Sequence, residues 1–131
     1  MSYRTFTKLD VYKKCRIFRR EISNLTSDFF PKEEKYLLKS QLKRASRSVT
    51  ANIAEGHGRY YYKVNIKFCR MARGSLEETL EHLITAFDEE YISKEQLKET
   101  KLIYDDCIKL LNGYIRYLKN TKPGDKDDTN H

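Results

Sequence analysis

Basic residues repeated at helical spacing are the strongest chemical signal in this sequence. They fall in two series, one stepping by four residues with an extra Arg beside it, the other stepping by four, four and three. The eight side chains are Lys39, Lys43, Arg44, Arg47, Arg59, Lys63, Lys67 and Arg70. Residues three or four apart share one side of a helix, and each cation that neutralises a phosphate releases a counterion. The pattern predicts binding to nucleic acid, RNA or DNA, that weakens steeply with salt.

Three consecutive tyrosines, Tyr60 to Tyr62, lie inside the second series. Aromatic rings among cations can stack on unpaired bases. The same rings could instead pack between helices or between subunits, and a charged stripe on a helix is often simply a solvated face. At the level of sequence, both interpretations of this stretch stay open.

The positive charge is concentrated in the first half of the chain. Among 131 residues, 26 Lys plus Arg stand against 19 Asp plus Glu, a net charge of +7. Residues 1–59 alone carry +8. An excess of this kind favours an anionic partner; the competing interpretation is a protein whose charge only keeps it soluble. The expected third helix is basic at its start and acidic near its end, which also suits head-to-tail contacts between subunits.

No catalytic or metal-binding constellation accompanies these cations. His57 and His82 lack the paired Glu-x-x-His motifs of a di-iron bundle. The sequence has no phosphate-binding glycine loop and no Ser-His-Asp or Cys-His spacing. Cys15, Cys69 and Cys107 are far apart and fall on apolar helical faces, which predicts reduced core thiols. We expect no enzymatic activity, no cofactor and no metal.

The hydropathy of the chain predicts a cytoplasmic protein. No apolar run approaches the roughly 20 residues that span a bilayer, and the first residues show no apolar segment of a signal peptide. We therefore expect no membrane association.

Apolar residues recur with the period of a helix over most of the chain, which predicts an all-α fold. Four helices are expected at about 9–26, 31–55, 60–87 and 94–119, within one bundle over 9–119. An extended lead-in is expected at 1–8 and a disordered polar tail at 120–131. Because the three connections are short, consecutive helices should be antiparallel, in an up-down-up-down four-helix bundle.

Five small or polar residues on the inner faces are expected to be structural. Asn52 should be hydrogen-bonded within the bundle and could set its register. Glu55 could hold the following loop, and Gly56 should allow a left-handed end to the second helix. Gly74 and Ser75 should let two helices approach closely.

Two segments resemble a known family. QLKRASRSVTANIAEGHGR at 41–59 and FCRMARGSLEE at 68–78 are similar to the signature of bacterial four-helix-bundle proteins encoded in intervening sequences of 23S ribosomal RNA genes. The likeness covers roughly residues 6–118. Within the family, the stretch EGHGRYYYKVNIKFCRMARGS looks closer to the accessory variability determinant of diversity-generating retroelements.

The resemblance implies a non-enzymatic, basic bundle that assembles as a barrel-shaped homopentamer. For the retroelement branch it further implies binding to nucleic acid and to a reverse transcriptase, as an accessory to mutagenic retrohoming. The alternatives are a protein of the ribosomal branch, or a bundle that is purely structural or interacts only with proteins. A neighbouring reverse transcriptase gene, or instead a location inside an rRNA gene, would distinguish the branches.

Overall fold

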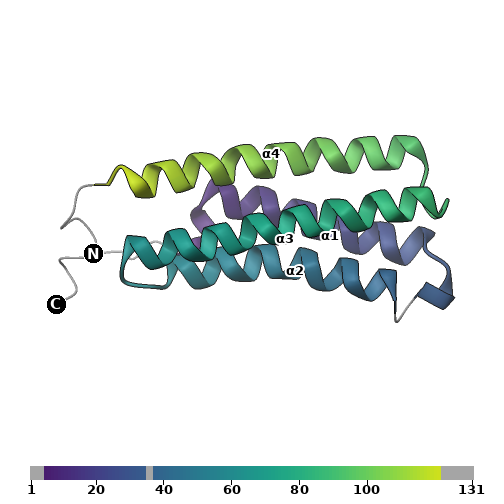
Figure 1. Cartoon of the computed structure of the whole chain (residues 1–131), viewed down its shortest axis with the longest axis horizontal. Helices are drawn as coiled ribbons and strands as arrows, with labels where there is room; N and C mark the ends of the chain where they lie inside the picture. The colour runs from purple at the N-terminus through teal and green to yellow at the C-terminus, as the bar shows by residue number, and fades with distance from the viewer. Residues whose placement is uncertain (1–4, 35–36, 122–131) are drawn as a thin grey trace.

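The computed structural model describes residues 5–34 and 37–121, and within them it contains four α-helices (Figure 1). These are α1 (Asp10–Phe29), α2 (Leu38–His57), α3 (Tyr62–Asp88) and α4 (Lys94–Lys119). Two single turns of 3-10 helix, η1 (Phe6–Lys8) and η2 (Lys32–Glu34), flank α1. The predicted all-α fold is confirmed.

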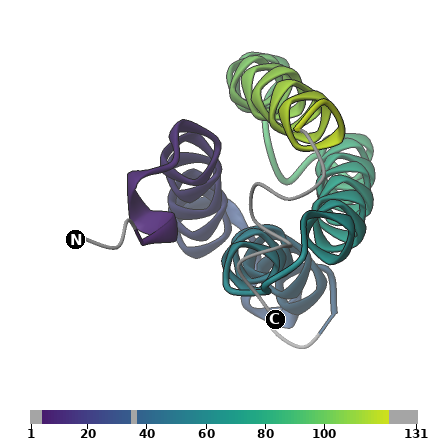
Figure 2. The same cartoon turned by 90° about the vertical axis from the view of Figure 1, so that its left-hand side faces the viewer.

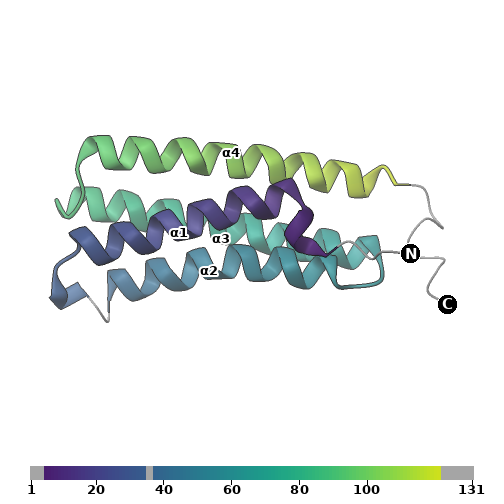
Figure 3. The same cartoon turned by 180° about the vertical axis from the view of Figure 1, so that it is seen from behind.

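Consecutive helices run in opposite directions, as the colour gradient shows from both sides (Figures 1 and 3). α1 packs against α2 and α4, and α3 packs against the same two helices. The bundle is therefore four-sided, and the end-on view places the α1–α2 side opposite the α3–α4 side (Figure 2). The contact between α2 and α3 is the most extensive of the four.

Large apolar side chains from all four helices fill the centre. Phe18, Ile22, Leu42, Leu83 and Leu111 are each completely buried. The predicted thiols are also in the core, since the three cysteines are buried and free. Burial of apolar surface at the predicted helical period is what holds the helices together.

The ends of α1 follow from local chemistry and differ in part from expectation. Phe30 is extended (φ −85°, ψ 142°), as expected for a residue before proline. The residues after Pro31 form η2 rather than opening the second helix, so that prediction is wrong, and α2 begins only at Leu38. Its first turn consequently contains no acidic residue.

The two ends of the chain are only partly described. The expected extended lead-in is replaced at Phe6–Lys8 by η1, whose Phe6 ring packs edge-on against Tyr12 at 4.8 Å. The predicted tail lies almost wholly outside the described residues, which end at 121. None of the described helices is both long and apolar enough to cross a membrane.

The start of α4 is fixed by a capping box, which the sequence Ser93-Lys94-Glu95-Gln96 predicts. Gln96 N donates to Ser93 Oγ at 3.1 Å, and Ser93 N donates to Gln96 Oε1 at 2.7 Å. This reciprocal pair satisfies two backbone donors that a helix start otherwise leaves open.

Candidate nucleic-acid interface

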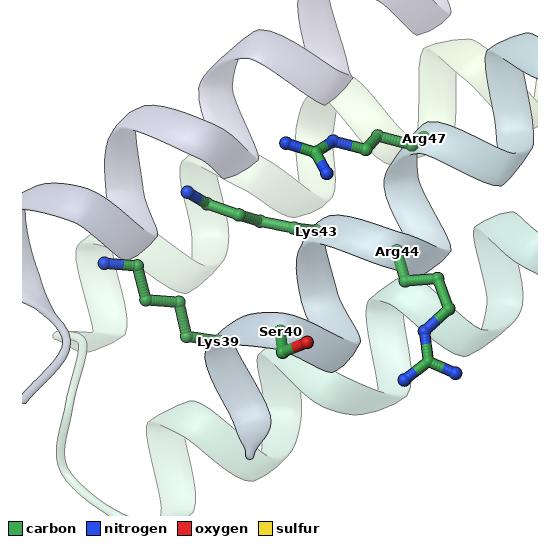
Figure 4. Close-up of a pocket in the computed structure, with 5 residues that line it drawn as sticks. All are labelled: Lys39, Ser40, Lys43, Arg44 and Arg47. Carbon is green, nitrogen blue, oxygen red and sulfur yellow. The ribbon is translucent and has the colours of Figure 1, made fainter. Parts of the chain in front are cut away.

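Three cations of the first series project from α2 on the side that faces α1. Figure 4 shows Lys39, Lys43 and Arg47 extending this way, whereas Arg44 extends away from α1. With Ser40 they line an open hollow of about 480 Å³. The structure thus groups all four predicted residues around one hollow, with Arg44 extending in a different direction from the other three.

Helix α1 adds a fourth cation that the sequence pattern missed. Arg19 Nη1 donates to Thr50 Oγ1 at 2.8 Å, and Thr50 Oγ1 donates to the carbonyl of Arg47 at 3.3 Å. Arg19 therefore lies beside Arg47 across the junction of the two helices. We call the set Arg19, Lys39, Lys43 and Arg47 the α1–α2 basic edge.

The cations of the α1–α2 basic edge are not neutralised by ion pairs within the described chain. None of its four cations lies in an ion pair with a described residue. The acids of α1 lie on its other flank. Lys14, Glu21 and Asp28 are seven residues apart in turn, hence on one face, and Lys14 pairs with Asp106 of α4 at 3.5 Å.

The electrostatics of α2 indicate that this arrangement does not serve helix stability. Lys39 lies in the first turn, where the N-cap residue makes no side-chain hydrogen bond to the helix. A cation near a helix N-terminus opposes the macrodipole, at a cost of about 0.3–1 kcal/mol. An anion bound along the edge would remove that repulsion.

The second predicted series lies on a different side of the bundle. Arg70 and Glu77 are seven residues apart and share one face of α3, and Glu77 accepts a hydrogen bond from Tyr104 of α4. Arg73, close to Arg70, donates to Asn112 Oδ1 of α4 at 2.7 Å. Lys63, Lys67 and Arg70 are therefore on the α3–α4 side, so the eight predicted cations do not form one surface.

The two series are also displaced along the bundle axis. Ser75 Oγ donates to Ser48 Oγ at 2.8 Å, which sets the antiparallel register of α2 and α3. Counting from this contact at 1.5 Å per residue, Lys39 and Lys63 are separated by roughly 30 Å of helix axis.

Arg59 is engaged within the fold. It pairs with Glu55 Oε2 at 2.6 Å, and its guanidinium lies 5.1 Å from the centre of the Phe68 ring. These contacts agree with the expected role of Glu55 in holding the connection between α2 and α3. Arg59 is accordingly a weaker candidate for phosphate binding than the unpaired cations.

The three tyrosines divide between packing and exposure. Tyr60 and Tyr61 are exposed, with ring centroids 5.5 Å apart, whereas Tyr62 is half-buried against the core. Tyr60 and Tyr61 occupy the α2–α3 connection and Tyr62 begins α3, at the opposite end of α2 from Lys39. No base-stacking platform thus accompanies the α1–α2 basic edge among the described residues.

Asn52 is hydrogen-bonded, as the sequence pattern predicts, but to a residue of its own helix. Its Nδ2 donates to the carbonyl and the hydroxyl of Ser48 in its own helix, at 2.9 and 3.0 Å. Ser48 in turn accepts from Ser75 of α3. Asn52 therefore contributes to the contact between α2 and α3 indirectly, by orienting Ser48.

The two glycines have roles other than those expected. Gly56 is inside α2 and not in a left-handed conformation. A Cβ at Gly56 would lie 2.6 Å from Asn65 Oδ1 and 2.8 Å from Phe68 Cβ, so close approach of α3 requires glycine there. Gly74 faces open space, with nothing within 4 Å of a Cβ, so the helix contact predicted at Gly74 is wrong.

Asn65 is a buried polar residue that the sequence pattern did not single out. It is 1% exposed, its Nδ2 donates to Tyr114 Oη at 3.1 Å, and its Oδ1 accepts from Cys69 Sγ at 3.5 Å. Burial raises the pKa of Tyr114 to about 12. The spacing of Asn65 to Cys69 and Ala72 is that of one helix face and would have revealed it.

The described residues contain no group of three or more His, Cys, Asp or Glu side chains that could hold a metal ion. His82 Nε2 lies 3.4 Å from Glu78 Oε2 on the same helix, as an isolated pair. The chemistry available at the basic edge is therefore charge neutralisation by Lys and Arg.

Comparison with known proteins identifies relatives by sequence and by structure. Residues 7–113 match the model of the family described as 23S rRNA-intervening sequence protein. A crystal structure from Bacteroides thetaiotaomicron VPI-5482, described as a protein with unknown function from the S23 ribosomal protein family, is similar with a TM-score of 0.74 and 26% identity. The match covers 80% of this chain and 97% of that one. No protein of curated function matches the sequence.

Proposed function

The chain belongs to the 23S rRNA-intervening sequence protein family, and from this premise we propose that it is a non-enzymatic protein that binds nucleic acid through the α1–α2 basic edge. The observation that carries the proposal is the grouping of four cations from two helices, none of them in an ion pair with a described residue. Family membership itself does not specify a ligand.

The chemistry of the edge favours the phosphate backbone over the bases. Lys and Arg with the neighbouring hydroxyl of Ser40 suit phosphate oxygens. Exposed aromatic rings for stacking lie elsewhere. Binding should therefore be nearly independent of sequence, with a log–log salt slope of about −3 for four phosphate contacts on a single strand.

The test is fluorescence anisotropy with a labelled oligoribonucleotide over a range of salt concentrations. The variant Lys43→Glu/Arg47→Glu should bind at least about tenfold more weakly and show a smaller salt slope, by roughly one for each phosphate that is no longer neutralised. Its matched control is Lys94→Glu/Lys98→Glu, which makes the same change in net charge with the same spacing on exposed α4. Equal decreases in affinity in the two variants would refute the edge as the site.

The proposal has three finer features. Partnership with a reverse transcriptase in mutagenic retrohoming rests on the resemblance of residues 55–75 to the retroelement branch, assembly as a homopentamer rests on the resemblance to the family as a whole, and a cytoplasmic location rests on the hydropathy and the cysteines of the sequence. Light scattering tests the subunit number. Copurification with a transcriptase encoded nearby tests the partner, and a gene located within an rRNA gene would argue for the ribosomal branch.

The competing function is a structural or protein-interaction bundle whose basic charge maintains solubility. It predicts no measurable nucleic-acid binding at physiological salt by the wild-type protein. The same anisotropy titration therefore separates the two candidates.

A further inference from the structure

A second group of cations lies along the α3–α4 side of the bundle. Its members, Lys63, Lys67, Arg70, Arg73, Arg116 and Lys119, form the α3–α4 basic edge. None of them is in an ion pair with a described residue. Three of them, with Asn112 and Ile115, line a hollow of about 370 Å³ between the two helices.

Contacts between α3 and α4 place these cations side by side. Asn65 bonds to Tyr114 and Arg73 bonds to Asn112, so the segment of α3 that holds Lys67 and Arg70 runs along the last turns of α4. Arg116 and Lys119 are in the last turn of α4. Cations from two helices thus converge, as they do on the α1–α2 basic edge.

Helix stability explains only part of this second edge. Arg116 and Lys119 stabilise α4 because cations near a helix C-terminus favour the macrodipole. Lys63 has the opposite effect in the first turn of α3, which holds no acid and whose N-cap makes no side-chain hydrogen bond. Both basic edges therefore include cations at the start of a helix, where they are unfavourable without an anion.

The two edges are far enough apart that a strand bound on one would interact only weakly with a strand bound on the other. They lie on opposite sides of the four-helix bundle, across interaxial distances of about 10 Å plus the side chains. Their centres, near Lys43 and Lys67, are further offset by roughly 20 Å along the axis, counted from the Ser48–Ser75 contact. Charges separated by more than about 8 Å are largely screened at physiological ionic strength, so two bound strands would repel each other little.

We propose that a single chain holds two nucleic-acid segments at once, one on each basic edge, and so bridges separate stretches of RNA or DNA. The first segment rests on the proposed function; the second is a separate site on α3 and α4. Tyr60 and Tyr61 are exposed in the connection that leads into α3, close enough along the chain for unpaired bases on this edge to stack on them. The α1–α2 basic edge has no such rings among the described residues.

The decisive measurement is the number of strands bound per chain, because it does not depend on how many subunits assemble. The probe is an oligouridylate of about eight nucleotides, within the usual site size of a single module, counted by native mass spectrometry at low salt. We expect two strands per chain for the wild type and for Lys94→Glu/Lys98→Glu. We expect one for Lys43→Glu/Arg47→Glu, one for Lys67→Glu/Arg116→Glu, and none for the quadruple variant.

The other outcomes separate the two proposals. One strand per wild-type chain whose binding is abolished only by the α2 variant overturns bridging and leaves the proposed function standing. One strand whose binding is abolished only by the Lys67 and Arg116 variant overturns both, because the binding site would then be on α3 and α4. Unchanged melting temperatures of the two double variants would show that any decrease in binding comes from charge and not from unfolding.

Discussion

Helix α1 has two flanks of opposite character, and comparing them shows how the charge of this protein is organised. Toward α2, Arg19 joins Lys39, Lys43 and Arg47. Toward α4, Glu21, Asp28 and Glu99 line a hollow of about 280 Å³, which we call the acidic edge. The net charge of +7 is thus unevenly distributed around α1, and binding should depend on position more than on total charge.

The hollow of the acidic edge is also lined by apolar residues, whereas only Lys, Arg and Ser residues line that of the basic edge. Leu25 and Phe29 line the same hollow, and Phe29 is 53% exposed. Lys14 and Asp106 form an ion pair on this flank. A phosphate backbone would meet repulsion here, whereas on the other flank of the same helix it would meet cations and the hydroxyl of Ser40.

The largest effect should come from exchanging charge between the two flanks. The variant Lys43→Glu/Arg47→Glu/Glu21→Lys/Asp28→Lys keeps the net charge at +7 but reverses both edges. We expect its affinity for single-stranded RNA to fall on the order of 100-fold, about 2.7 kcal/mol, as measured by anisotropy at fixed salt. Retained affinity would mean that total charge, and not the α1–α2 basic edge, drives binding.

The second-largest effect concerns the packing of α2 against α3, which keeps the two basic edges apart. Gly56→Ala puts a methyl group against Asn65 Oδ1 and Phe68 Cβ, and such overpacking should lower the free energy of unfolding by about 2 kcal/mol. The control is Gly58→Ala, where a Cβ meets nothing closer than 3.6 Å. Chemical denaturation checks both, and a Gly56→Ala protein as stable as wild type would contradict the close approach of α2 and α3.

A third, smaller effect concerns the far end of α4. The pKa of Tyr114 is raised to about 12, above its unfolded value of about 10. Its neutral hydroxyl therefore adds stability that is complete below about pH 10 and disappears as the pH rises to about 12. Partial exposure of the ring limits the decrease to about 1 kcal/mol.

Thermal melts between about pH 9 and about pH 12, which bracket the ordinary tyrosine pKa of about 10, would measure this decrease. Tyr114→Phe should show a shallower decline, although it leaves Asn65 without its partner and is less stable at neutral pH. Burial also raises the pKa of Cys69 to about 12, so a residual slope is expected. Identical slopes in the two proteins would exclude Tyr114 as the alkaline-sensitive group.

The smallest effect should follow neutralisation of the acidic edge. Glu21→Gln/Asp28→Asn/Glu99→Gln raises the net charge by three, yet all three positions face away from the proposed site. We expect RNA affinity to rise less than about threefold, near 0.6 kcal/mol, through long-range attraction that salt screens. A large gain would show that the acidic edge normally weakens binding and that the contrast between the flanks is incomplete.

The fold was largely predictable because it depends on local periodicity. The inner positions Val11, Cys15, Phe18, Ile22 and Leu25 are all buried, as their spacing predicts. The capping box at Ser93 was also predictable, since it involves residues three apart. The beginning of α2 was not, because proline and acids suit a 3-10 turn as well as a helix start.

Only part of the candidate site was predictable, because helical spacing relates residues of one helix and not residues of neighbouring helices. Spacing within α2 correctly placed Lys39, Lys43 and Arg47 together. It could not show that Arg19 joins them, that Arg44 points away, or that Lys67 and Arg70 belong to the opposite side. Those relations depend on which flank of each helix meets which neighbour.

Four amphipathic helices, a basic excess in the first half of the chain and membership of a family can all be read from the order of the residues. The division of the cations into two edges, the need for glycine at Gly56 and the burial of Asn65 depend instead on how the helices pack. The physical reason is the distance along the chain between the residues that interact. Helical periodicity relates residues a few positions apart, so it can be recognised in the sequence. The packing of two helices brings together residues that are far apart in the chain.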